Sequence, residues 1–141
     1  WKYLENQGII SNQEYINATF TQHYRTVEEF RAPFDNKDSA ISKSGLILKS
    51  CETMITECPY KIHYSNNKDT MSPRDYAKTL IPTMRSWSET VFRNALVNRT
   101  EREINEIVDK FYNLYIDEVS NDPEGHSMDY VHVIMDIEKA Y

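Results

Sequence analysis

Histidine is the side chain best suited to proton transfer near neutral pH, and this chain has four. His63 and His126 lie in or beside polar stretches, which predicts solvated side chains. His132 stands between two valines, which favours a structural role. His23 is the strongest candidate, because it directly precedes Tyr24 and Arg25. The sequence offers no complete acid–base set, so we assign no catalytic residue.

Two cysteines are the other candidates for chemistry. Cys51 and Cys58 are seven positions apart, which is about 23 Å along an extended strand. A disulfide needs Cα atoms within about 7 Å, so we expect reduced thiols, as in an intracellular protein. A zinc site that adds His63 lacks the spacing of a standard finger, and no metal site is expected.

Glycine is scarce, and this excludes the common glycine-rich loops that bind phosphates and nucleotide cofactors. The chain has Gly8, Gly45 and Gly125, far apart from one another. A loop that cradles a phosphate or a dinucleotide needs several glycines within a few residues. The GxSxG, HExxH, CxxC and DxDxDG motifs are also absent. We therefore expect no cofactor-binding residue in this chain.

The composition of the chain limits the classes of partner that it is expected to bind. The chain has 141 residues, a net charge of −6 and 12% aromatic residues. An acidic chain with scattered cations is a poor ligand for nucleic acid or anionic membranes. No apolar run approaches the roughly 20 residues of a membrane span. A cytoplasmic protein is expected, and the opening Trp-Lys-Tyr-Leu is typical of mid-protein sequence.

Helices are predicted mainly from their capping residues. Gly8 suits the end of a helix over residues 1–8. Thr26 and Glu29 form a capping box for a helix ending near Pro33, before a polar loop over 35–44. Ser72 and Pro73 begin a further helix, and Thr100 with Glu103 begins another. Each of these last two helices has a predicted apolar stripe. In the helix that begins at Ser72 the stripe is Leu80, Met84, Trp87 and Val91. In the helix that begins at Thr100 it is Ile104, Ile107, Val108, Phe111, Leu114 and Tyr115.

Two strands complete the prediction, over residues 45–57 and 128–138. The second is apolar on both faces, which is typical of a strand covered on both sides in an α/β sheet. Helices precede the first strand and separate the two strands, so we predict an α/β fold and the end of a larger domain.

Read as ordered blocks, the chain resembles the SABATH family of carboxyl methyltransferases, including its fatty-acid-methylating branch. The matching blocks, which together extend over nearly the whole chain, are Glu5–Ile10, Tyr24–Phe34, Ser44–Leu46, Met84–Glu89, the helix 101–119 and Tyr130–Met135.

The resemblance implies a Rossmann-like methyltransferase sheet with a helical cap over the substrate. The predicted strands would be its last two, antiparallel neighbours at the sheet edge, with the helices of 72–120 between them. The chain, 1–141, would then be a single C-terminal fragment. The family's glycine-rich loop for S-adenosyl-L-methionine would lie in a preceding half that this chain lacks.

Four substrate-binding residues are carried over from the resemblance. Met84 and Trp87 correspond to apolar pocket residues of the helix block, and Tyr130 to the aromatic that opens the last strand. Tyr24 corresponds to the aromatic before the Glu-Glu block, near the pocket rim. The simpler alternative is that Trp87 packs against the helix 101–119.

The implied reaction transfers a methyl group to a small or fatty carboxylic acid. A carboxylate is already a nucleophile at neutral pH, so catalysis rests on placement and desolvation. The alternatives are a non-enzymatic α/β interaction module without a cofactor site and a complete small protein of unrelated function. Whether the protein forms a homodimer is left open. This chain alone is expected to be inactive.

Overall fold

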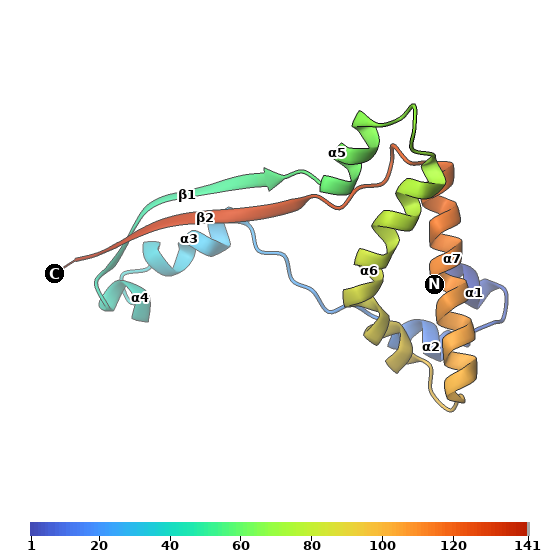
Figure 1. The fold of residues 1–141 in the computed structure, drawn as a ribbon. Helices are drawn as coiled ribbons and strands as arrows, with labels where there is room; N and C mark the ends of the chain where they lie inside the picture. Colours follow the sequence, from blue (N-terminus) through green and yellow to red (C-terminus); the bar gives the residue numbers. More distant parts are fainter. Residues whose placement is uncertain (141) are drawn as a thin grey trace. The chain divides into compact units, whose positions relative to one another are not determined.

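The computed structural model describes residues 1–140 and divides them into two compact units. The helical unit comprises residues 1–21 and 59–127, and the strand unit comprises residues 22–58 and 128–140. Figure 1 shows their elements, which in chain order are α1 Lys2–Asn6, α2 Asn12–Asn17, α3 Val27–Asp35, α4 Ala40–Lys43, β1 Leu46–Thr56, α5 Pro59–Asn66, α6 Pro73–Ala95, α7 Glu101–Asn121 and β2 Tyr130–Lys139.

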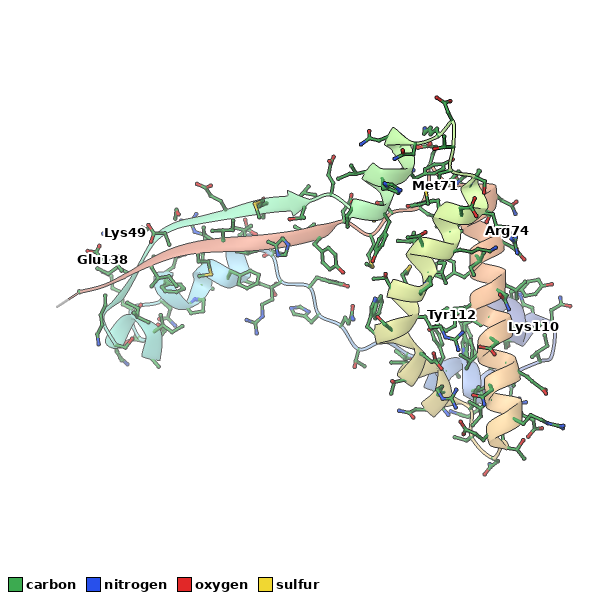
Figure 2. All side chains as sticks on the ribbon, viewed as in Figure 1. Lys49, Met71, Arg74, Lys110, Tyr112 and Glu138 are labelled. Atoms are coloured by element: carbon green, nitrogen blue, oxygen red, sulfur yellow. The ribbon has the colours of Figure 1, made fainter. Side chains whose placement is uncertain are left out.

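The strand unit is built on an antiparallel pair, which confirms the predicted pairing of the two strands. β1 and β2 form a two-stranded sheet in which Cys51 lies opposite Met135 and Thr53 opposite Val133. The register shifts between Leu48 and Ser50, where Lys49 forms an ion pair with Glu138 (Figure 2). The structure is thus mixed α/β, with a sheet of two strands within residues 1–140.

Only one face of this sheet is covered within the strand unit. α3 and α4 pack on β1 (Figure 1). Side chains alternate between faces along a strand. The half-buried members of the covered face, which we call the inner face, are Leu46, Leu48, Cys51, Val133 and Met135. Apolar residues of the outer face are exposed, and they include Met54, Tyr130 and Ile134, with 47%, 48% and 50% of their surface accessible. The expectation of cover on both faces is therefore not met within the described residues.

In the helical unit, α6 and α7 pack against each other as an α-helical hairpin (Figure 1). Ser88 and Tyr112 are both buried, and their hydroxyl oxygens are 2.8 Å apart across the interface. Phe92 packs its ring on Trp1 and Phe111, at centroid distances of 4.7 and 4.5 Å. An apolar and aromatic core thus joins the hairpin to the start of the chain.

A buried ion pair fixes α2 to the loop between α6 and α7. Glu14 is 3% exposed, and Arg99 donates to its two carboxylate oxygens at 2.6 and 2.8 Å. The same carboxylate accepts from the backbone N–H of Ser11, and Arg99 also donates to the Ile9 carbonyl. The bond to Arg99 is the main cause that lowers the pKa of Glu14 to about 2.

The predicted helix starts are confirmed. Thr26 and Thr100 each form both bonds of a capping box, and the Ser72 hydroxyl accepts from the Asp75 backbone. Gly8 has a φ of 67°, as expected of a residue that ends a helix. α3 runs on to Asp35, two residues beyond the proline that was expected to end it.

Three predictions about the helices are corrected. The stretch 35–44 is not all loop, because it contains α4. The N-cap of α4 is Ser39, and no acidic residue follows it to complete a capping box. Residues 59–66, to which no element was assigned, form α5, which starts at Pro59. The buried face of α6 is not the predicted stripe: Leu80 is buried, but Trp87 is 49% exposed. The remaining buried residues of α6 are Tyr76, Ala77, Ile81, Ser88, Phe92 and Ala95.

No helix within residues 1–140 combines the length and apolar character needed to cross a bilayer.

Candidate functional site

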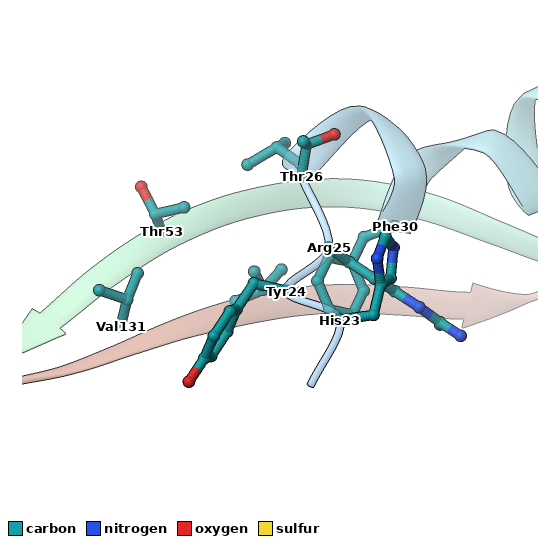
Figure 3. Close-up of a pocket in the computed structure, with 9 residues that line it drawn as sticks. His23, Tyr24, Arg25, Thr26, Phe30, Thr53 and Val131 are labelled. Carbon is teal, nitrogen blue, oxygen red and sulfur yellow. The ribbon is translucent and has the colours of Figure 1, made fainter. Parts of the chain in front are cut away.

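An open groove of about 720 Å³ lies in the strand unit, between the start of α3 and the inner face of the sheet (Figure 3). Ligand-binding clefts commonly have volumes of 300–1,000 Å³. The lining residues are His23, Tyr24, Arg25, Thr26, Val27, Phe30, Thr53, Val131 and Val133.

The walls of the groove follow from local sequence. The capping box orients the first turn of α3: the Thr26 hydroxyl accepts from the backbone of Glu29, and the Glu29 carboxylate accepts from the backbone of Thr26. The floor follows from strand alternation, which places Val131 and Val133 on the same face of β2. The result is an apolar floor beneath a polar rim.

The rim carries two basic side chains in different settings. His23 Nε2 lies 3.3 Å from Glu29 Oε1. The backbone N–H of Thr26, and then the His23 ring, hold the pKa of the Glu29 carboxyl below its usual range. Arg25 instead lies over the ring of Phe30, with 5.9 Å between the guanidinium carbon and the ring centroid (Figure 3). The Arg25 charge adds a smaller contribution that also lowers the pKa of the Glu29 carboxyl.

Tyr24 is the one predicted site residue that lines this groove (Figure 3). Its side chain is 83% exposed, and its hydroxyl donates to the Gln22 side chain at 2.6 Å. The role that the resemblance implies for Tyr24, at the rim of a pocket formed by Met84, Trp87 and Tyr130, stays a prediction, because none of these three residues lines this groove.

Tyr130 is in the same unit but on the other face of β2. It lies opposite Thr56 in the sheet, and its ring stacks on His132 with 6.2 Å between centroids. Because side chains alternate along a strand, Tyr130 points away from the face that carries Val131. The structure therefore does not bring Tyr24 and Tyr130 to one cavity.

Met84 and Trp87 belong to α6 in the helical unit. Met84 is half-buried, and the Trp87 ring makes an edge contact with Phe20, at 5.9 Å between centroids. At this level of α6, Ser88 faces Tyr112 of α7. The four predicted residues are thus divided between the two units. The convergence of Met84, Trp87 and Tyr130 on one pocket stays a prediction, and Tyr24 lies on the other side of the sheet from Tyr130.

A charged cluster beside Met84 holds α6 against α7. Arg85 donates to Glu89 at 2.6 Å, pairs with Asp109 at 2.8 Å and lies over the Tyr112 ring. The bond from Arg85 is the main cause that lowers the pKa of Glu89. These charges are mutually satisfied, which indicates a role in positioning the helices.

The remaining candidate catalytic and metal-binding side chains do not come together in one site within residues 1–140. Cys58 is buried and Cys51 is half-buried, and both are free thiols. Within residues 1–140, no three histidine, cysteine or acidic side chains come together as a metal site. His63 lies beside the Asn67 side chain, and His126 beside the Asp122 carbonyl.

Sequence reasoning assigned most of the groove residues to no site, among them Arg25, Phe30 and Val133. The sequence indicated that the second strand is apolar on both faces, but not which helix covers either face. Arg25 precedes α3 and Phe30 lies in the first turn of α3, so their contact joins an irregular segment to a helix, which no periodic pattern predicts.

Neither the models of known protein families nor the curated proteins include a match to this chain.

Proposed function

We propose that this chain is the substrate-cap half of an S-adenosylmethionine-dependent O-methyltransferase that methylates a small or fatty carboxylic acid. The parent would be a longer, cytoplasmic enzyme with a Rossmann-like sheet. In this proposal β1 and β2 are the last two strands of that sheet, and α5, α6 and α7 form the cap inserted between them.

The observation that supports this most is the path of the chain from β1 to β2. The two strands are antiparallel partners, although residues 57–129 separate them and contain three helices. A long helical insertion between the paired final strands is what the SABATH resemblance implies. The exposed apolar residues on both faces of β2 also suit a strand that lies inside a larger sheet.

The glycines of this chain do not fit a site for S-adenosylmethionine. Gly8 ends α1, and Gly45, with a φ of 78°, forms the turn before β1, where an added Cβ would lie 3.3 Å from the Ala140 carbonyl oxygen. Gly125 lies against the Asp122 side chain in a separate turn. Each glycine serves its own turn, so the proposal places the cofactor in the preceding half of the parent.

The part left to this chain is to bind and shield the acceptor. A carboxylic acid is ionised at neutral pH and needs no base to become a nucleophile. Apolar walls such as Met84 and Trp87 would orient the acceptor and exclude water, and Tyr130 would contribute aromatic surface. The incomplete acid–base set agrees with such a role, because placement and desolvation supply most of the catalysis.

Calorimetry with S-adenosylmethionine tests whether cofactor binding requires the preceding half of the parent. We expect no heat of binding at micromolar ligand for residues 1–141, because this chain has no backbone loop that can hold the methionine and ribose groups. The longer protein, extended upstream of Trp1, should bind the cofactor in the micromolar range. Micromolar binding by the short chain would contradict the proposal.

The exposed sheet favours one alternative, a non-enzymatic interaction module. β1 and β2 have no third strand within residues 1–140, and a two-stranded sheet is marginally stable by itself. A binding partner could cover it in place of a parent domain. The upstream coding sequence distinguishes the two functions: a strand followed by a glycine-rich loop supports the enzyme, and its absence supports the module.

A further inference from the structure

We propose that the free edge of β2 pairs with the same edge of a second copy of this chain, antiparallel and with a two-fold axis at Ile134. This inference goes beyond the proposed function, because it concerns a backbone edge that binding of an acceptor does not use. In the longer protein a strand of the preceding half would compete for this edge, so the pairing is proposed for residues 1–141 and tested on them.

The two edges of this sheet differ in how well they can accept another strand. In β1 the register shifts between Leu48 and Ser50, and the extra residue at this point is Lys49. Irregular backbone and lysine side chains are devices by which natural sheets discourage pairing at an edge. β2 contains neither proline nor glycine, and no third strand pairs with it within residues 1–140. Its outer edge is therefore the better template for a further strand.

Charge complementarity selects a second copy as the occupant and fixes the register. When the two copies of Ile134 face each other, His132 of each copy lies opposite Asp136 of the other. Both side chains are exposed and lie on the outer face of the sheet. A histidine donates a hydrogen bond to a carboxylate when neutral and adds an ion pair when protonated. A shift of two residues in either direction would place Asp136 opposite Ile134 or Tyr130 and remove both pairs.

The inner face is apolar throughout in the same register. Val131 lies opposite Ile137, and Val133 opposite Met135, once on each side of the axis. Val131 and Ile137 are 68% and 42% exposed in the single chain, so pairing removes apolar surface from water. The product is a four-stranded sheet with the order β1-β2-β2-β1. Sheets of three or more strands with an apolar face are more stable than an isolated pair, which gives the pairing a driving force.

Sedimentation equilibrium of residues 1–141 tests the pairing. We expect a monomer–dimer equilibrium with a Kd of about 100 μM or tighter, as for a small interface. His132→Asp should weaken it at least about tenfold, because like charges then lie opposite each other on both sides of the axis. Combining His132→Asp with Asp136→His exchanges the two partners and should restore the Kd to within about threefold. Thr56→Asp is the matched control: it adds the same charge to the outer face but on β1, and should change the Kd less than about threefold.

Disulfide cross-linking tests the register without changing any charge at the proposed pairs. At the two-fold axis the two copies of residue 134 have Cα atoms about 5 Å apart, so Ile134→Cys should form a covalent dimer on mild oxidation. Glu138→Cys is the matched control on the same face, because its two copies would lie about 26 Å apart along the paired strands and should form none. Each variant is compared with the unchanged chain, whose Cys51 is half-buried and Cys58 buried.

The outcomes separate this pairing from the proposed function. A chain that stays monomeric at about 1 mM would overturn the pairing. So would a dimer whose Kd His132→Asp leaves unchanged, or one that cross-links equally through residues 134 and 138, because its interface would then lie elsewhere. If the short chain dimerises as expected and the longer protein methylates no acid, the proposed function fails and the pairing stands. If the short chain is monomeric and the longer protein methylates an acid, the pairing fails and the function stands.

Discussion

Replacing Arg99 with methionine should lower the free energy of unfolding by about 3 kcal/mol, the largest stability effect we expect from a single change outside the apolar core. The substitution leaves the Glu14 carboxylate, which is 3% exposed, without its cation. It also removes the bond from Arg99 to the Ile9 carbonyl, which ties the start of the chain to the loop before α7. Urea denaturation followed by circular dichroism measures the change.

Arg102→Met is the matched control for this variant. Arg102 is 86% exposed, and its nitrogen lies 3.7 Å from the Glu106 carboxylate one helical turn away. Exposed pairs of this kind contribute less than about 1 kcal/mol, so the control should be nearly neutral. Equal losses in the two variants would show that burial of Glu14 does not determine the effect.

The same ion pair predicts the response to acid. The pKa of Glu14 is about 2 in the folded chain, below its ordinary value of 4.5. The unfolded state therefore binds this proton more readily, and the stabilisation is complete above pH 4.5 and is lost as the pH falls towards 2. We expect about 2 kcal/mol of acid-sensitive stability that Arg99→Met removes, after allowing for solvent screening at the partly exposed guanidinium.

Replacing Trp87 with alanine should change acceptor choice in the longer enzyme or raise its KM for the acceptor. Enlarging an apolar pocket in this way is worth about 1–3 kcal/mol of discrimination, or roughly ten- to a hundredfold in KM. Binding of S-adenosylmethionine should change much less, because the proposal places the cofactor in the other half of the parent. Because Trp87 is 49% exposed and its ring contacts Phe20, the cost in stability should be modest.

Val97→Ala is the control for Trp87→Ala. Val97 is 46% exposed and lies two residues beyond the end of α6, so its truncation removes exposed apolar surface from the same unit. It should leave KM and the acceptor profile unchanged. If Trp87→Ala lowers only the melting temperature and leaves the acceptor profile and KM as they were, Trp87 is a packing residue and its assignment to the site is wrong.

The capping residues made the starts of the long helices predictable from the sequence. A threonine with glutamate three positions later encodes both bonds of a capping box within four residues, and the starts of α3 and α7 follow from it. The face that a helix buries depends on its partners instead. The predicted stripe of α6 included Trp87, but the structure buries the adjacent Ser88, because its hydroxyl meets Tyr112 of α7. The short helices α4 and α5 carry no capping box and were missed.

The strand pair was predictable in its pairing but not in its surroundings. The apolar residues of β1 and β2 indicated two strands, and the resemblance implied that they are antiparallel neighbours. Whether each face is covered depends on other segments, and within residues 1–140 α3 and α4 cover one face alone. The groove arises from this partial cover, so its lining, including Arg25 and Phe30, could not be read from sequence periodicity.

Transfer of a labelled methyl group tests the central claim most directly. The longer protein, incubated with S-adenosylmethionine labelled in its methyl group and with dodecanoate or a small carboxylic acid, should form a labelled methyl ester that mild base hydrolyses. Residues 1–141 alone should form none. Labelled ester from the longer protein is the result that the proposal predicts. A longer protein that binds the cofactor but esterifies no carboxylic acid, or that binds no cofactor, would contradict it.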